Sequence, residues 1–217
     1  MIIKDKRVVV TGAASGIGKA LAVAFKEAEA QSVVAVDINL EGAEETAKDI
    51  NGISIKANVG QESDILNVIE KANELSGGID IFCSNAGIGG VHGFFDAKNE
   101  DWQNIWEVNV MSHIYAARNV LPQMLERGEG YLMSTASAAG LLTQIGSAGY
   151  SVTKAAAVSF AEWIKITYGK QSDYATPVSL GMVDRKKNAS LYWDYMVSFC
   201  QFGGYVNFKV TTENYKD

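Results

Sequence analysis

Cysteine and histidine are scarce in this sequence, which contains two of each among 217 residues. Cys83 and Cys200 lack the spacing of a metal site and are too few for a disulfide framework, so we expect two reduced thiols. His92 and His113 show no metal-ligand pattern either. The sequence therefore predicts neither a metal centre nor a fold that depends on disulfides.

The chain also lacks a block of basic residues, and its formal net charge is -6 with a pI near 5.0. Nonspecific binding to nucleic acid or to an anionic membrane needs clustered lysine and arginine, so we expect neither partner. No apolar run is long enough for a membrane helix. The charged residues Lys4, Asp5 and Lys6 argue against a secretory signal, and we expect a cytoplasmic protein.

What the sequence does contain is an alternation of short apolar runs with longer segments of helical periodicity. With 47% hydrophobic residues the chain can bury one large core, and we expect a single domain over residues 1–217. The alternation indicates repeated strand-helix units that build a parallel sheet. Because parallel crossovers are right-handed, helices must cover both faces, so we predict a doubly wound α/β fold. The expected strands are Arg7 to Thr11, Ser32 to Asp37, Gly52 to Ala57, Ile79 to Ser84 and Tyr131 to Ser134.

Two long segments carry helical signals in the second half of the chain. Residues 99–127 contain an apolar stripe that includes Trp102 and Trp106, which predicts a helix packed on the core. Residues 151–168 form a second helix-forming run. Gly77 and Gly128 fall where helices are expected to stop.

A glycine-rich turn follows the apolar run Val8-Val9-Val10. Glycine allows positive φ and lets phosphate oxygens approach the backbone, and the helix that begins there presents free N–H groups to a pyrophosphate. The turn therefore predicts a dinucleotide site, although a glycine-rich turn without a ligand is the alternative. The expected contacts are Gly12, Ser15, Gly16, Ile17 and Gly18.

Asp37 ends the second predicted strand, where an acidic residue can accept hydrogen bonds from the adenosine ribose hydroxyls. Its charge would repel a 2′-phosphate, and no Arg or Lys stands in the glycine turn or directly after Asp37 to attract one. The sequence thus predicts NAD as the cofactor in preference to NADP. The alternative is a solvated carboxylate at a strand end.

Tyr150 and Lys154 are four residues apart at the start of a helix-forming run, which places them on one face about a turn apart. A free tyrosine has a pKa of about 10, so proton transfer near neutral pH needs nearby positive charge to favour the phenolate. Tyr205 and Lys209 repeat the spacing but lack a serine thirteen positions upstream, where Tyr150 has Ser137. We therefore predict that Tyr150 is the proton-transfer group, the alternative being an exposed aromatic beside a solvated lysine.

These motifs, in this order, resemble the short-chain dehydrogenase/reductase family over about residues 6 to 170. The resemblance implies a Rossmann-like fold and an NAD-dependent enzyme that acts on CH–OH groups. It also implies that Ser137 hydrogen-bonds the substrate oxygen, that Lys154 binds the nicotinamide ribose beside Tyr150, and that Asn109 holds a water that relays protons from the lysine. The motifs concerned are Thr11 to Gly18, Ser84-Asn85-Ala86-Gly87, Asn109, Ser137, Tyr150 and Lys154.

The resemblance extends to the adenosine half of the cofactor. It implies that Asn85, Ala86 and Gly87 support the sheet and border the adenine ribose. The family commonly carries an aspartate at the end of the third strand to contact the adenine amino group, and this chain has Asn58 followed by Val59. An amide oxygen can still accept that hydrogen bond, so we expect both residues to contact the cofactor.

The carboxyl-terminal residues 171–217 depart from the family. After the helix with Tyr150 the family has a sixth strand, a Pro-Gly turn, a substrate lid and a seventh strand. Residues 177–184 are compatible with a shortened sixth strand and turn, but no Pro-Gly follows and the remainder is crowded with Tyr, Phe, Asn and Ser. A genuine variant, a replaced or frame-shifted terminus and a chain rebuilt for another purpose all remain open.

The leading hypothesis is an NAD-dependent oxidoreductase that interconverts a secondary alcohol and a ketone. Residues 89–95 and 141–145 are expected to border the substrate, and their apolar character favours a neutral, partly hydrophobic molecule. The resemblance implies a homodimer or homotetramer that assembles through the long helices. Two alternatives stay open: a catalytically weak or inactive dinucleotide-binding protein, and a structural or partner-binding domain of the same fold.

Overall fold

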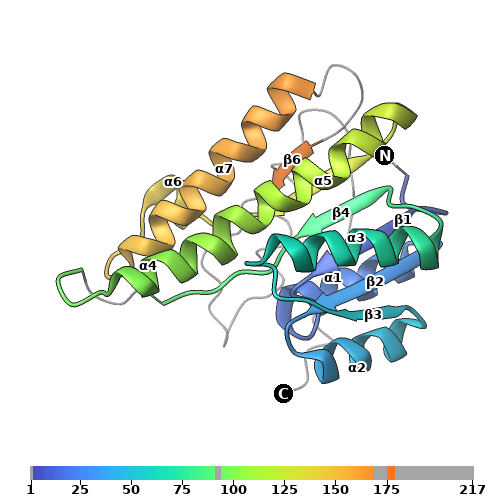
Figure 1. Ribbon diagram of the computed structural model, residues 1–217, viewed down its shortest axis with the longest axis horizontal. Coiled ribbons are helices and arrows are strands. Elements are labelled where there is room, and N and C mark those ends of the chain that lie inside the picture. Colours follow the sequence, from blue (N-terminus) through green and yellow to red (C-terminus); the bar gives the residue numbers. More distant parts are fainter. Residues whose placement is uncertain (1, 91–93, 169–174, 179–217) are drawn as a thin grey trace.

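The described part of the chain forms one parallel β-sheet. The computed structural model describes residues 2–90, 94–168 and 175–178. Within them six strands lie in the order β3-β2-β1-β4-β5-β6, and all neighbouring pairs are parallel (Figure 1). The chain adds β2 and β3 on one side of β1 and the later strands on the other, which confirms the predicted doubly wound fold. The strands are β1 (Arg7–Thr11), β2 (Ser32–Asp37), β3 (Ile53–Lys56), β4 (Ile81–Ser84), β5 (Tyr131–Thr135) and β6 (Ala175–Val178).

The predicted strand bounds are close to those in the structure. β1 and β2 begin and end where expected, and β3 is one residue shorter at each end. β4 begins at Ile81 and not at Ile79, while β5 extends to Thr135. β6 includes the start of the segment 177–184 that was expected to form a shortened sixth strand, and the rest of that segment lies outside the described residues.

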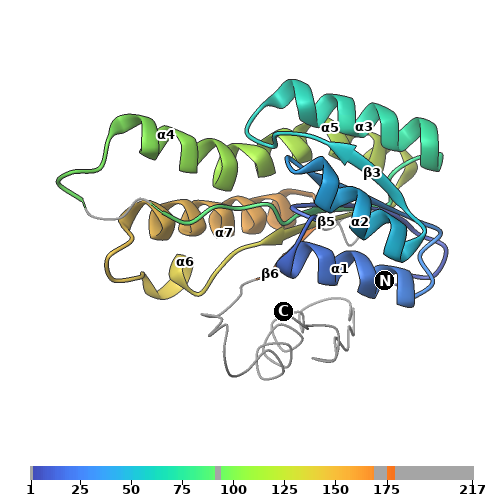
Figure 2. The same cartoon turned by 90° about the horizontal axis from the view of Figure 1, so that it is seen from below.

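Helices cover both faces of the sheet, as the crossover argument predicts. On one face α1 and α2 contribute Leu21, Phe25 and Ile50 to a hydrophobic cluster. On the other face α3, α5 and α7 contribute residues such as Val120 and Ile164 to a second cluster. Figure 2 shows α3 and α5 above the sheet and α1 below it. The helices are α1 (Gly16–Glu27), α2 (Leu40–Ile50), α3 (Glu62–Ser76), α4 (Asn99–Trp106), α5 (Ser112–Arg127), α6 (Ala139–Leu142) and α7 (Ala148–Tyr168), with a π-helical turn, η1 (Glu107–Met111), between α4 and α5.

The first strand shows why the apolar runs are unbroken. Val8 and Val10 belong to the cluster beneath α1, whereas Val9 belongs to the cluster on the opposite face. All three are at most 1% exposed. Because successive side chains of a strand point to opposite faces, a strand covered on both faces is apolar at every position.

The long helical segment 99–127 differs from the prediction in one respect. It contains the π-helical turn η1, with the buried Asn109 at its centre, where periodicity predicted plain helix. Such turns occur frequently at functional sites. The helix stops were predicted correctly, because Gly77 and Gly128 cap α3 and α5 in the left-handed conformation with φ of 77° and 72°. In the apolar stripe, Trp102 is half-buried and Trp106 is 38% exposed.

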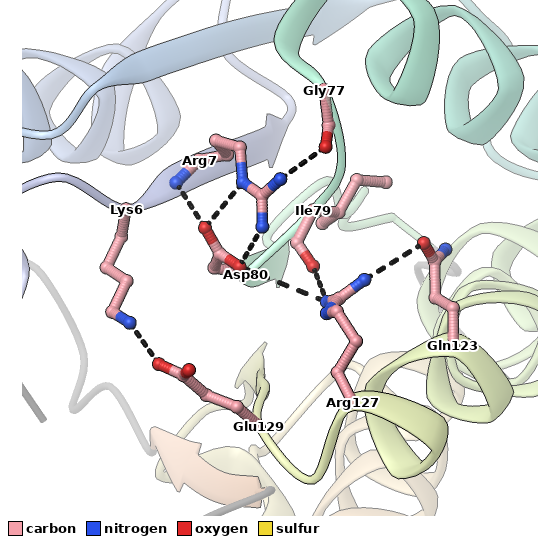
Figure 3. A network of polar contacts seen from close by, with 8 residues as sticks. All are labelled: Lys6, Arg7, Gly77, Ile79, Asp80, Gln123, Arg127 and Glu129. Atoms are coloured by element: carbon pink, nitrogen blue, oxygen red, sulfur yellow. Dashed lines mark hydrogen bonds and ion pairs between the residues drawn. The ribbon is translucent and has the colours of Figure 1, made fainter.

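An ion pair joins two strands at the edge of the sheet where the strands begin (Figure 3). One carboxylate oxygen of Asp80, just before β4, accepts from the backbone N and the Nε of Arg7 at 2.9 and 2.7 Å, and the other accepts from Nη2 at 2.6 Å. The guanidinium also donates to the carbonyl of Gly77. Burial raises the pKa of Asp80, but the hydrogen bonds and charge of Arg7 outweigh it and hold that pKa below its usual range.

The same network reaches the end of α5. Arg127 donates through Nη2 to the carbonyl of Ile79 at 2.5 Å and lies 3.9 Å from Asp80. Lys6 and Glu129 form a further ion pair beside it. The start of β1, the turn before β4 and the turn before β5 are therefore held together by charge (Figure 3).

We predict that Asp80→Ala lowers the free energy of unfolding by about 2 kcal/mol, because it leaves the half-buried guanidinium of Arg7 without its carboxylate partner. Urea denaturation measures the change. Lys4→Ala, which removes the exposed Lys4–Glu29 pair, is the control and should leave the midpoint nearly unchanged.

The loss of unfolding free energy caused by Asp80→Ala should depend on pH. A carboxyl whose pKa is lowered by folding contributes stability above its unfolded pKa of about 4, and that contribution is lost as pH falls through the folded pKa. The difference in the free energy of unfolding between wild type and Asp80→Ala should therefore become smaller below about pH 4. An equal difference at pH 3 and pH 7 would contradict this account.

Candidate active site

The candidate residues lie at one edge of the sheet, opposite the Arg7–Asp80 ion pair. Gly12 follows β1, Asp37 ends β2, Asn85 follows β4, and Ser137 comes shortly after β5. Because the carboxyl ends of parallel strands meet at the same edge, the structure brings together segments that are distant in the sequence.

The glycines of the first turn have distinct geometries. Gly12 has φ of +70°, and a Cβ there would lie 2.9 Å from Ala86 Cα, so the turn packs directly on the segment after β4. A Cβ at Gly18 would lie 2.0 Å from the carbonyl oxygen of Gly12, which only a glycine avoids. Gly16 has φ of +55° with no heavy atom within 4 Å of the Cβ position, so its backbone faces open space. Ser15 is the exposed N-cap residue of α1, and Ile17 is half-buried.

Asn85 braces three strand ends. Its Nδ2 donates to the carbonyl of Thr11 at 3.0 Å, and its Oδ1 accepts from Thr135 Oγ1 at 3.0 Å. The hydroxyl oxygen of Thr11 accepts from the backbone N–H groups of Asn85 and Ala86 at 3.0 and 3.1 Å. The amide side chain thus ties β1 to β5 across β4, which is the sheet-supporting role expected for it.

Asp37 holds backbone groups on two sides. Its Oδ2 accepts from the N–H of Ala14 in the glycine turn, and its Oδ1 accepts from the N–H of Asn39, both at 3.0 Å. A carboxylate has about four acceptor positions, so two of them stay available to ribose hydroxyls.

Asn58 and Val59 differ in what they can offer a ligand. The Oδ1 of Asn58 accepts from the N–H of Gly60 at 3.0 Å, and one lone pair remains on that oxygen. Val59 is 7% exposed and its side chain belongs to a hydrophobic cluster, so a contact with a cofactor would have to come from its backbone.

Asn109 lies fully buried in η1 and makes three hydrogen bonds. Its Oδ1 accepts from the N–H of Ile88 at 2.8 Å, and its Nδ2 donates to the carbonyl of Ile88 at 2.8 Å and to Thr153 Oγ1 at 3.2 Å. The side chain therefore fixes the segment after β4 against α7. Its Oδ1 keeps one free lone pair.

Lys154 is buried in spite of its charge. Its side chain crosses to β5, where Nζ donates to the carbonyl of Thr135 at 2.9 Å, and the residue is 3% exposed. Burial lowers the pKa of Lys154 to about 8. A Cβ at Gly87 would lie 3.3 Å from both this Nζ and Asn109 Oδ1, so the two groups converge on Gly87.

Tyr150 and Ser137 complete the predicted set. The Lys154 Nζ lies 5.7 Å from the centre of the Tyr150 ring, which confirms the expected one-turn separation on α7. Ser137 is buried, and its Oγ accepts from the N–H of Ala139 at 3.2 Å. The other Tyr-x-x-x-Lys pair, at 205 and 209, lies outside the described residues.

Sequence reasoning missed a buried histidine beneath the site. His113 on α5 is 2% exposed, its Nδ1 lies 3.2 Å from Ser134 Oγ, and its Nε2 has no hydrogen-bond partner among the described residues. Burial, and then the charge of Lys154, lower the pKa of His113 to about 3. The imidazole is thus uncharged at neutral pH. Its position in the sequence carries no motif that would have signalled this.

Of the two cysteines, Cys83 on β4 is free and buried, and burial raises its pKa. Cys200 and His92 lie outside the described residues. Among the residues that the structure describes, no three His, Cys, Asp or Glu side chains gather as a metal ligand set would. In the same ranges no helix combines the length and apolar character needed to cross a bilayer.

Apolar side chains are exposed on the two segments expected to border a substrate. Phe94 and Phe95 precede α4, and Leu141, Leu142 and Ile145 lie in and after α6, all more than half exposed. Residues 91–93 of the first segment lie outside the described part of the chain.

Comparison with known proteins supports this picture. The family model for short chain dehydrogenases matches residues 6–192, which extends beyond residue 170, where the sequence motifs end. An uncharacterized oxidoreductase of Staphylococcus aureus (strain USA300) is 33% identical over 84% of this chain and 80% of its own length. The uncharacterized oxidoreductase YvrD of Bacillus subtilis (strain 168) is 35% identical over 73% of this chain and 61% of its own length.

Two solved structures are similar in fold. A short-chain type dehydrogenase/reductase from Mycobacterium marinum superposes with a TM-score of 0.77 at 28% identity, covering 82% of this chain and 76% of its own. The 3-ketoacyl-(acyl-carrier-protein) reductase from Brucella melitensis complexed with NADH superposes with a TM-score of 0.78 at 27% identity, also covering 82% of this chain and 76% of its own. The chain belongs to the short chain dehydrogenase family of oxidoreductases.

Proposed function

We propose that this protein is an NAD-dependent oxidoreductase that interconverts a secondary alcohol and a ketone. The observation that carries the proposal is the buried ammonium of Lys154, one helical turn from Tyr150 and facing Gly87 at the edge of the sheet where the glycine turn lies. Lys154 has no carboxylate partner among the residues that the structure describes, and an unpaired buried cation is costly and typical of a functional site.

The residues present fit a dinucleotide. Gly16 offers an open backbone at the start of α1, where N–H groups without helical partners and the positive end of the dipole favour a pyrophosphate. Asp37 keeps acceptor positions for the adenosine ribose, and Asn58 keeps one for the adenine amino group. Gly87 leaves room beside Lys154 for the nicotinamide ribose. Bound NAD would supply a hydride acceptor, and NADH a hydride donor.

The chain's own residues would manage the proton. In the oxidative direction Tyr150 Oη takes the proton of the substrate hydroxyl, and in reduction it returns one to the carbonyl oxygen. The ammonium of Lys154 favours the phenolate by its charge, and the carbonyl of Thr135 holds that ammonium in place. Ser137 Oγ donates to the substrate oxygen. The free lone pair of Asn109 Oδ1 holds a water through which Lys154 exchanges protons with solvent.

The substrate that suits this site is neutral and partly hydrophobic. We assign the exposed apolar side chains of Phe94, Phe95, Leu141, Leu142 and Ile145 to the border of the site, because burying them against an apolar substrate is favourable.

A homodimer is the assembly we propose, through α7. Val152, Trp163 and Ile166 are 49%, 53% and 77% exposed and recur on one side of that helix. An apolar stripe on a helix face favours contact with another protein surface, here a second copy of the chain.

Ile166→Glu should convert the dimer to a monomer, because it places a charge in the proposed contact. Sedimentation equilibrium measures the mass against the monomer value of 23.4 kDa. Leu75→Glu, which charges an exposed leucine on α3, is the matched control and should leave the dimer intact. A wild-type chain that sediments as a monomer would contradict the proposed assembly.

The wild-type kcat/KM should favour NADH over NADPH by roughly tenfold or more, because the charge of Asp37 repels a 2′-phosphate. Asp37→Asn removes the charge, while its amide oxygen can still accept from the N–H of Ala14. The ratio of kcat/KM for NADH to kcat/KM for NADPH should therefore fall. Steady-state kinetics with both cofactors measures it, and a wild-type preference for NADPH would refute the assignment.

Tyr150→Phe should reduce turnover roughly a thousandfold, because general acid–base catalysis contributes on that order. NADH binding, followed by fluorescence titration, should be retained. Tyr205→Phe, in the second Tyr-x-x-x-Lys pair, is the control and should keep wild-type rates. The assay uses a panel of apolar and anionic secondary alcohols, and the apolar ones should give the higher kcat/KM.

Unchanged turnover in Tyr150→Phe would remove this residue from the mechanism. A higher kcat/KM for the anionic alcohols would overturn the substrate assignment. NADH binding by a wild-type chain that turns over no alcohol in the panel would favour a catalytically inactive dinucleotide-binding protein.

A further inference from the structure

Helix α2 contacts the glycine turn through Thr46 and Gly42. The carbonyl of Ala13 accepts a hydrogen bond of 2.8 Å from Thr46 Oγ1, 33 residues later in the chain. The N–H of Ala13 donates to the carbonyl of Val36 at 3.1 Å, and the N–H of Ala14 donates to Asp37 Oδ2 at 3.0 Å. Three polar groups of the Ala13–Ala14 backbone are therefore held by β2 and α2.

The hydroxyl of Thr46 is unusual for a helical threonine. Such a hydroxyl commonly bonds to a carbonyl of its own helix, whereas this one reaches out of α2 to the turn. Thr46 and Ala13 are both fully buried, so no water competes for the bond. If the hydroxyl were absent, the Ala13 carbonyl would be buried without this partner, which is unfavourable.

Gly42 lies one turn before Thr46, on the same face of α2. A Cβ at Gly42 would stand 2.8 Å from Ala14 Cβ and 3.3 Å from the carbonyl oxygen of Ala14. The lack of a side chain there lets the turn rest directly on the helix. Gly42 allows the close approach of α2 to the turn, and Thr46 makes the hydrogen bond between them.

The turn needs such support because glycines on both sides of it are conformationally free. Gly12 and Gly16 have positive φ, and a glycine backbone loses more conformational freedom on ordering than that of any other residue. The N–H groups at the start of α1 can bind an anion without loss of further entropy only if the peptide before them is already fixed.

We propose that Thr46 is a positioning residue for the dinucleotide: its hydroxyl holds the glycine turn in the conformation that receives the pyrophosphate. The proposal rests on the proposed function for the identity of the ligand. Among the described residues Thr46 hydrogen-bonds to the turn and not to the candidate catalytic set, so its loss should weaken cofactor binding and leave the chemical step at saturating cofactor unchanged.

The test compares Thr46→Val, which keeps the shape and removes the hydroxyl, with Thr46→Ser, which keeps the hydroxyl. Ile50→Val is the control, since it removes a methyl from a buried residue of α2 that belongs to the hydrophobic cluster. Two quantities are measured: amide hydrogen exchange of residues 12–18 in the chain without cofactor, and the Kd for NADH by fluorescence titration.

In Thr46→Val we expect exchange in residues 12–18 to accelerate and the Kd to rise roughly tenfold, with kcat at saturating NADH unchanged. Thr46→Ser should stay within about twofold of wild type in both quantities. Ile50→Val should leave both unchanged even where urea denaturation shows it to be as destabilised as Thr46→Val.

Unchanged exchange and Kd in Thr46→Val would overturn the proposal, as would equal changes in Ile50→Val. Failure of the proposed function looks different, because the wild-type chain would then bind neither NADH nor NADPH. In that case the exchange rates decide alone: faster exchange only in Thr46→Val supports the role of Thr46 in holding the turn, and unchanged exchange overturns it.

Discussion

The hydrogen bond from Lys154 Nζ to the carbonyl of Thr135 is the interaction on which the candidate site depends. An ammonium that is 3% exposed has lost most of its hydration, and burial lowers its pKa to about 8. A single carbonyl dipole compensates only part of that loss. The charge is therefore poised to interact strongly with any negative charge that develops beside it, and the phenol of Tyr150 is one helical turn away.

Two neighbours of Lys154, His113 and Asn109, influence how its charge acts in the site. His113 is held neutral by burial and by the charge of the lysine itself, so its imidazole adds no second positive charge beside Lys154. Asn109 uses both donors of its amide within the protein, which fixes its oxygen toward the space at Gly87 that Lys154 also faces. The π-helical turn η1 places Asn109 in this position, within an otherwise regular helical segment.

Much of this arrangement could be predicted from the sequence, because the relevant signals are local. The valine run of β1, the glycines after it and the four-residue spacing of Tyr150 and Lys154 each have a meaning within a few residues. Thr46, Thr153 and Thr135 could not be found in this way. Each acts on a partner that is 33, 44 or 19 residues distant, and a threonine in a helix or strand has no motif that reveals such a contact. The π-helical turn was missed because it is only five residues long and is too short to change the apolar periodicity of the whole segment.

The two edges of the sheet use polar groups in opposite ways. Where the strands begin, the charges of Arg7 and Asp80 neutralise each other and join β1 to the turn before β4. Where the strands end, hydrogen bonds to backbone and side-chain groups hold the elements together: Asn85 joins Thr11 to Thr135, and the turn after β1 is held by the carboxylate of Asp37 and the hydroxyl of Thr46. The groups still available to a ligand at that edge include the backbone at Gly16, the ammonium of Lys154 and the remaining acceptor positions of Asp37. Because these groups are fixed before any ligand arrives, little reorganisation would be needed when a dinucleotide binds, and this favours a binding site built into the fold over one that forms on binding.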